Sequence, residues 1–141
     1  MNTLEEKAGE FLEKNTFMRY NHIRMRSIER DRAVFSLTVQ PESCNTYGMI
    51  HGAALYALAD NAAGAATDSD GRWYVTQSSG FHFLKNVSAG EVTATAVVRH
   101  RGRRTCLTDV EITAEDGTKL AIGDFTFFCV DRETVLKKAE P

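Results

Sequence analysis

Asp60 is the residue of this chain whose setting most needs a chemical explanation. It stands in the run HGAALYALADNAAGAAT, residues 51–67, where its nearest neighbours are leucine and alanine. A carboxylate among apolar side chains is costly to bury unless it is paired or hydrogen-bonded. Asp60 is therefore either an exposed or capped residue at the edge of a helix, or a catalytic base or nucleophile whose pKa is tuned by its surroundings.

A polar loop of small residues comes directly before this run. Asn45, Gly48, His51 and Gly52 stand where a helix would begin, and a helix N-terminus offers unpaired N–H groups and the positive end of the helix dipole. The N–H of Gly52 could stabilise negative charge on a reacting carbonyl oxygen, and the missing Cβ would let a ligand approach. Taken singly, each of these residues is more often structural, as a turn glycine or a helix cap.

The spacing of these groups limits how they could act together. His51 and Asp60 are nine residues apart, which places them about 13 Å apart along a helix axis and on opposite sides of it. One reacting carbon cannot contact both ends of such a helix. Either only one of the two residues is catalytic, or two chains of a two-fold dimer contribute to each site.

The element that carries Asp60 is predicted to be a long, buried central helix. Residues 51–67 are mostly alanine and leucine with almost no β-branched residues, which favours helix, and they lack a wide polar face. Small alanine side chains would let strands pack closely around it. A second helix, over residues 4–14 of an N-terminal helical segment 1–15, is indicated by the capping box Thr3-Leu4-Glu5-Glu6.

The remaining segments have the composition of strands. They are predicted at residues 19–30, 32–39, 73–84, 90–101, 104–114 and 119–131, and the close spacing of the last four predicts a meander. Runs of strands around one helix indicate the α+β class. An antiparallel sheet wrapped around one long central helix is the hot-dog fold. The strand near residues 73–83 is expected at the sheet edge, where the sheets of two chains could join.

Length, charge and cysteine content fit one cytoplasmic domain. The 141 residues are interpreted as a single domain 1–141 with a charged tail at 132–141. The net charge of −2 gives no general attraction to nucleic acid or to an anionic membrane. The N-terminus does not read as a signal peptide, and no apolar run is long enough for a membrane span. Cys44, Cys106 and Cys129 form no C-x-x-C pair and are expected to be reduced thiols.

The segment NTYGMIHGAALYALAD, residues 45–60, resembles the PaaI-like branch of the hot-dog thioesterases. That family has an N-x-x-G-x-x-H-G-G segment followed by a helix that carries L-A-D or L-x-D. The similarity continues at residues 75–77, 83–85, 90–91 and 100–103 and covers most of the chain after about residue 30. Two positions depart from the pattern. Ala53 stands where a second glycine is common, and Asn86 stands where the proline of an Arg-Pro pair is common.

The resemblance implies hydrolysis of an acyl-CoA thioester to free acid and CoA, without metal or other cofactor. Gly52 N–H, with Asn45 nearby, would polarise the thioester carbonyl. Asp60 of the partner subunit would attack the carbonyl carbon or activate water. Thr76 would orient that water or the carboxylate, although the alignment could shift this role to Gln77 or Ser78. His51 would support the loop or lie near the leaving sulfur.

The CoA moiety is expected to meet basic residues outside this segment. Lys85, Asn86 and the hairpin His100-Arg101-Gly102-Arg103 could hold its phosphates, because arginine pairs well with phosphate oxygens. The alternative for the hairpin is an ordinary solvated turn. Aromatic and large apolar residues could line an acyl or aryl pocket or could simply be core; they include Tyr47, Met49, Tyr56, Trp73 and Phe81.

Two other functions fit the same fold. A hot-dog domain could bind acyl-CoA without turning it over, although the set Asn45, Gly52 and Asp60 argues against this. A hot-dog dehydratase or hydratase would need a differently placed acid–base pair aimed at the α and β carbons of the acyl group. The expected assembly is a homodimer with shared sites, and a homotetramer built as a dimer of dimers stays open, as does the identity of the acyl group.

Overall fold

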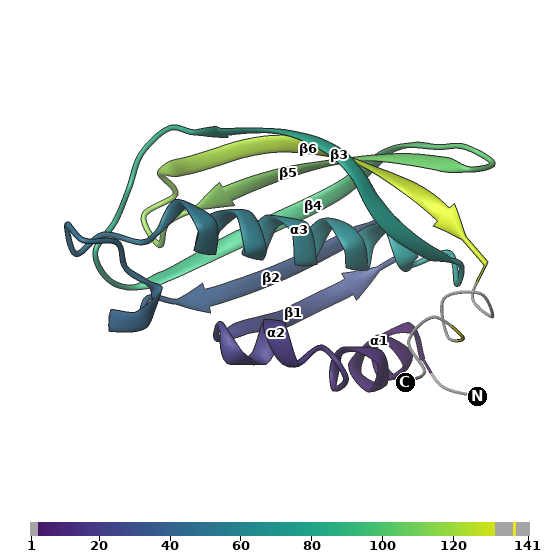
Figure 1. Ribbon diagram of the computed structural model, residues 1–141, viewed down its shortest axis with the longest axis horizontal. Helices are drawn as coiled ribbons and strands as arrows, with labels where there is room; N and C mark the ends of the chain where they lie inside the picture. Colours follow the sequence, from purple (N-terminus) through teal and green to yellow (C-terminus); the bar gives the residue numbers. More distant parts are fainter. Residues whose placement is uncertain (1–2, 132–136, 138–141) are drawn as a thin grey trace.

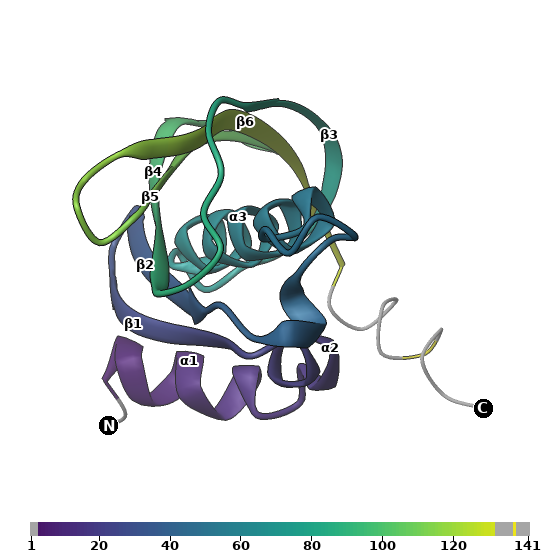
Figure 2. The same ribbon diagram turned by 90° about the vertical axis from the view of Figure 1, so that its left-hand side faces the viewer.

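The computed structural model describes residues 3–131 and residue 137 and has one layer of sheet curled around one helix (Figures 1 and 2). The elements in chain order are α1 Leu4–Leu12, α2 Thr16–Tyr20, β1 Ile23–Glu29, β2 Arg32–Thr38, the 3₁₀ turn Pro41–Ser43, α3 Gly52–Asp68, β3 Trp73–Phe83, β4 Glu91–Arg101, β5 Thr105–Thr113 and β6 Lys119–Val130. Every strand pair is antiparallel. The predicted α+β hot-dog fold is confirmed.

The central helix α3 is buried on the faces that the sheet covers. The side chains of Leu55, Leu58 and five small residues are inaccessible there, so the alanine-rich composition serves the close approach of the strands. The side of α3 that lies between β3 and α2 has no strand of the described chain over it (Figure 2). On that side Ala53 and Tyr56 are exposed, and Asp60 is partly exposed.

The strand order β1-β2-β4-β5-β6-β3 confirms part of the predicted meander and corrects the rest. Strands β4, β5 and β6 follow one another as expected. Strand β3 pairs with β6 and not with β4, because residues 84–90 form a long connection across the end of the sheet and not a tight hairpin turn (Figure 1). Strand β3 therefore lies at the edge of the sheet, as predicted, and its outer backbone edge is unpaired within the described chain.

The N-terminal segment differs from the predicted single helix. The capping box at Thr3 and Glu6 is present, but α1 ends at Leu12. Asn15 then starts the short α2 by accepting a hydrogen bond from Met18 N–H at 3.0 Å. Both helices lie beside β1, at the edge of the sheet opposite to β3 (Figure 2). Of the predicted charged tail 132–141, only residue 137 lies within the described residues. No helix in the described part of the chain is long and apolar enough to cross a membrane.

Candidate active site

Asp60 lies where α3 meets the edge strand β3. Its Oδ1 accepts a hydrogen bond from Thr76 Oγ1 at 2.8 Å. Burial raises the pKa of the Asp60 carboxyl above its ordinary value, and the hydrogen bond from Thr76 lowers it by a smaller amount. Among Thr76, Gln77 and Ser78, the structure brings Thr76 to the carboxylate. The strand is irregular between Thr76 and Ser78, where the register with β6 shifts.

The first turn of α3 presents a backbone donor. His51 is the N-cap, and its Nδ1 accepts the N–H of Ala53 at 2.9 Å. The His51 carbonyl oxygen accepts the N–H groups of Ala54 and Leu55. The N–H of Gly52 has no acceptor among the described residues. It lies one residue before Ala53, whose N–H is the first that the His51 side chain can reach. The imidazole of His51 thus orders the helix start and leaves the Gly52 N–H available to a ligand.

The side chain of Asn45 folds the loop that leads to this helix start. Its Oδ1 accepts the N–H of Tyr47 at 2.9 Å and the N–H of Met49 at 3.2 Å. Gly48 has a φ of 78°, a left-handed conformation that favours glycine. The side-chain carbonyl oxygen of Asn45 therefore forms its hydrogen bonds inside the loop. Tyr47 is 84% exposed at its tip, and Met49 is partly buried.

Three positions on the open side of α3 follow one another at four-residue intervals. They are Gly52, Tyr56 and Asp60, so Tyr56 lies midway between the free N–H and the carboxylate. Strand β3 runs along this side in the opposite direction, and Tyr56 Oη lies 2.6 Å from Ser79 Oγ. Gly52 and Asp60 are about 12 Å apart along the helix axis. Within one chain, the two groups cannot act on the same carbon.

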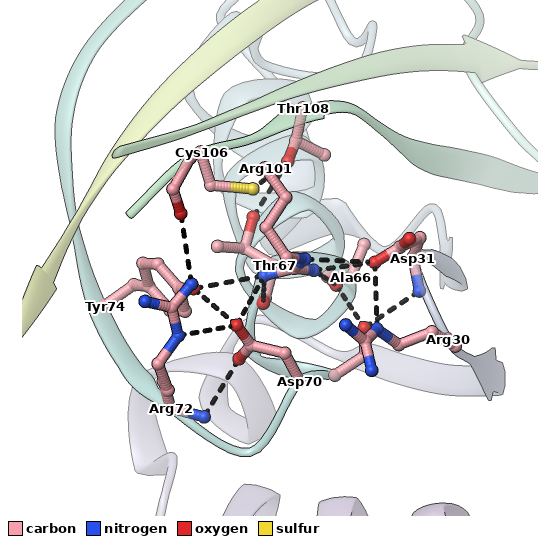
Figure 3. A network of polar contacts seen from close by, with 12 residues as sticks. Arg30, Asp31, Ala66, Thr67, Asp70, Arg72, Tyr74, Arg101, Cys106 and Thr108 are labelled. Carbon is pink, nitrogen blue, oxygen red and sulfur yellow. Dashed lines mark hydrogen bonds and ion pairs between the residues drawn. The ribbon is translucent and has the colours of Figure 1, made fainter. Parts of the chain in front are cut away.

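Arg101, which we predicted in phosphate binding, is used inside the chain (Figure 3). Its side chain is 15% exposed and contacts Asp31 and Asp70, at 2.8 Å and 2.9 Å. Its Nη1 also donates to the carbonyl oxygen of Thr67 at 2.8 Å, and Nη2 to that of Ala66 at 3.3 Å. A guanidinium with this set of acceptors caps the C-terminus of α3. It therefore has few N–H groups left to donate to a phosphate.

The same network holds the hairpin that follows Arg101. Arg72 donates to the carbonyl oxygens of Gly102 and Arg103, at 3.3 Å and 2.8 Å, while its Nε pairs with Asp70 at 2.8 Å. Burial would raise the pKa of Asp70, but hydrogen bonds from Tyr74 and Arg72 and the charge of Arg101 hold it at about 2. Asp70 and Arg72 were not predicted from the sequence, because nothing in their spacing marks them as partners of Arg101.

The other predicted CoA contacts lie in two separate places. His100 and Arg103 are exposed beside the C-terminus of α3, where Arg101 meets the helix. Lys85 and Asn86 are exposed in the connection after β3, beyond Phe83, whose ring lies against Gly52 at the N-terminus of α3. One chain therefore does not bring the two groups together. The side chain of Asn86 accepts the N–H of Val87 at 2.8 Å and orders its own loop.

Two surface hollows of the single chain lie away from these residues. One of about 480 Å³ is on the outer face of the sheet, lined by residues such as His82, Arg99 and Asp124. Another of about 430 Å³ lies beside α2 and β1. Neither includes Gly52, Asp60 or Thr76. Among residues 3–131 and 137, no group of three or more acidic, histidine or cysteine side chains is arranged to hold a metal ion.

Comparisons with known proteins agree on one family. A family model described as the thioesterase superfamily matches residues 47–121. Acyl-coenzyme A thioesterase PaaI of Escherichia coli K12 is 35% identical over 97 residues, which are 68% of this chain and 69% of that protein. In the structural comparison, the E. coli PaaI protein from the phenylacetic acid degradation operon has a TM-score of 0.87 at 29% identity, covering 91% of this chain and 94% of that one.

Two streptococcal structures show coenzyme A compounds on similar chains. The Streptococcus mutans protein smu.793, bound to acetyl CoA, has a TM-score of 0.74 at 28% identity. A hypothetical thioesterase of Streptococcus pneumoniae, solved with coenzyme A, has a TM-score of 0.74 at 30% identity. Each match covers 77% of this chain and 88% of the streptococcal chain.

Proposed function

This chain belongs to the thioesterase superfamily as an acyl-CoA thioesterase of the PaaI family, and we propose that each of its catalytic sites is built from two chains. In this proposal, the N–H of Gly52 stabilises the oxyanion, and Asp60 of the partner subunit is the base or nucleophile. The observation that carries it is the arrangement along α3. A free N–H and a hydrogen-bonded, half-buried carboxylate lie on the same open side of one helix, but about 12 Å apart.

A two-fold axis beside Tyr56 would unite these groups. Because Tyr56 is midway between them, rotation about such an axis places Gly52 of one chain near Asp60 of the partner subunit, and the reverse. Ser79, which contacts Tyr56, would then lie near the axis in β3. The outer edge of β3 is unpaired within the described residues, and large apolar side chains around it are exposed, as a dimer interface requires. Val75 in β3 and Tyr56 in α3 are examples.

The chemistry divides between the two helix ends. Asp60 takes a proton from water while the water oxygen bonds to the thioester carbon, and the carbonyl oxygen becomes an anion that Gly52 N–H stabilises. The C–S bond then breaks, the carbonyl re-forms, and the CoA thiolate takes up a proton. A pKa raised by burial suits a carboxylate that must accept a proton. Direct attack by Asp60 would instead give a mixed anhydride, which water hydrolyses to the same products.

The same symmetry would gather the predicted CoA contacts. Lys85 and Asn86 lie near the N-terminus of α3, and His100 and Arg103 lie near its C-terminus. When one helix end faces the opposite end of the partner helix, the two groups come to one site from different chains. The streptococcal relatives with acetyl CoA and coenzyme A support a CoA site in this fold.

The direct test is Asp60→Asn, which keeps the side-chain volume and removes the base. We expect kcat for release of CoA thiol to fall at least about a hundred-fold, since a positioned base contributes on that order. Circular dichroism and elution volume should match the wild type. Asn61→Asp together with Asp60→Asn serves as a control, because it restores the charge one residue away without the contact to Thr76. Wild-type turnover by folded Asp60→Asn protein would contradict the assignment.

A further inference from the structure

The ring of Phe83 lies against the start of α3. Phe83 is the last residue of β3, and its Cε1 and Cζ atoms are 3.3 Å and 3.4 Å from the position that a Cβ at Gly52 would take. Apart from the residues next to Gly52 in the chain, the three atoms nearest to that position all belong to the Phe83 ring. The ring therefore stands beside the free N–H of Gly52, and 56% of the residue is exposed.

Neighbouring rings hold Phe83 in this place. The centroid of Phe81 lies 5.1 Å away in an edge-to-face contact at 79°, and Phe81 makes a second edge-to-face contact with Tyr56 at 5.5 Å. Tyr56 is fixed in turn by Ser79 at 2.6 Å. Tyr56, Phe81 and Phe83 form an aromatic wall that follows α3 from the oxyanion donor toward the middle of the helix.

An exposed aromatic side chain held in this way costs free energy in water unless something apolar covers it. In the two-chain site, the thioester carbonyl lies near Gly52. The acyl chain attached to it must therefore extend away from Gly52 along some part of the protein surface. On the CoA side, the arm next to the sulfur carries amide groups and gains less from aromatic rings than an apolar chain does. The acyl chain gains free energy with each methylene group that it buries against them.

We propose that Phe83 determines acyl specificity: the aromatic wall receives an apolar acyl chain of several carbons and places its carbonyl oxygen at Gly52 N–H. This inference rests on the proposed function and adds the class of acyl group to it. An acetyl group is too short to contact more than the first ring, so the enzyme should discriminate against it.

Binding of non-hydrolysable thioethers separates this inference from the catalytic one. Wild-type protein should bind S-hexyl-CoA at least about ten-fold more tightly than S-ethyl-CoA, as expected for several buried methylene groups. Phe83→Ala should lose most of that preference. Leu84→Ala should keep it, because it removes a similarly exposed apolar side chain from the next residue. Phe83→Leu keeps an apolar side chain and should keep part of the preference, which guards against a folding defect.

A double-mutant cycle tests the contact itself. Gly52→Ala keeps the N–H but adds a Cβ that crowds the Phe83 ring. If the wall lies at the reacting carbonyl, the loss in kcat/KM for hexanoyl-CoA caused by Gly52→Ala should shrink several-fold in the Phe83→Ala background. Equal losses in both backgrounds would mean that the ring does not act there.

The outcomes distinguish the two proposals. A thioether preference that persists in Phe83→Ala, or no preference in the wild type, would overturn the role of the wall even if the protein hydrolyses acyl-CoA. A Phe83-dependent preference in a protein that releases no thiol from acyl-CoA would keep the wall and contradict the proposed mechanism.

Discussion

At the scale of single residues, the contact between Thr76 and Asp60 partly offsets the effect of burial on the pKa of the carboxylate. The hydrogen bond favours the charged form and lowers the pKa that burial raises. Thr76→Ala should therefore raise the pKa of Asp60, so that the acid limb of kcat/KM moves to higher pH, with about a ten-fold loss near neutral pH. Thr76→Ser should restore the wild-type profile. The role is refuted if the acid limb of Thr76→Ala does not move.

The groups of the proposed site could be named from sequence, but not all of their contacts. Asp60 stood out because a carboxylate in an alanine-rich helix needs a reason, and Gly52 because a helix start leaves N–H groups free. That Thr76 and not Ser78 reaches Asp60 was not predictable, because the register of β3 shifts between these two residues and such an irregularity has no sequence signal. Phe83 was missed as a partner of Gly52, because the contact joins a helix start to a strand end 31 residues later.

At the scale of elements, the C-terminus of α3 carries an acidic group that titrates near neutral pH. Burial, and next the charge of Asp70, raise the pKa of Asp68 to about 7, and Asp68 Oδ1 is buried without a hydrogen-bond partner in the described chain. A carboxyl whose folded pKa is raised favours the folded state below its unfolded pKa of 3.8 and loses that advantage as pH rises toward 7.

Asp68→Asn should therefore stabilise the protein at alkaline pH. The free energy of unfolding should rise by about 2–4 kcal/mol at pH 8 relative to wild type, and the gain should vanish near pH 4. Urea denaturation at the two pH values measures this. Asp116→Asn is a matched control, since Asp116 is fully exposed in a turn. A gain that is the same at both pH values would mean that Asp68 does not titrate as the structure implies.

The elements themselves followed from sequence more closely than their arrangement did. Alanine content predicted α3, and strand-like composition predicted β4, β5 and β6 to within a few residues. The position of β3 next to β6 was not predictable from chain order, because it depends on how the sheet curls around α3. The contacts of Arg101 were not predictable for a similar reason. A basic hairpin is typical of a phosphate site, and only the fold shows that the Arg101 guanidinium donates to the carbonyl groups of Ala66 and Thr67.

At the scale of the whole molecule, the two-fold axis should pass close to Ser79 in paired β3 strands. A residue beside such an axis faces its own copy, so Ser79→Cys should form an intermolecular disulfide under mild oxidation. Cysteine at Trp73, six residues along the strand, should not, because its two copies would be far apart. Non-reducing electrophoresis reads the result, with wild type as the control for Cys44, Cys106 and Cys129. Cross-linking of the Trp73 variant alone would place the axis elsewhere.

The central claim is that Gly52 and Asp60 of each working site come from different chains. It can be tested by mixing two inactive variants. Gly52→Pro removes the N–H and keeps the backbone conformation, since proline is tolerated at the first position of a helix and His51 already has the extended backbone that precedes proline. Gly52→Ala is its control for added bulk. The second variant is Asp60→Asn.

Subunit exchange between Gly52→Pro and Asp60→Asn gives mixed dimers with one complete site and one site that lacks both groups. If half of the dimers are mixed, thiol release from acyl-CoA should recover to about a quarter of the wild-type rate, while each variant alone stays inactive. Mass spectrometry of differently tagged chains confirms the exchange. No recovery in a mixture with confirmed mixed dimers would contradict the shared site.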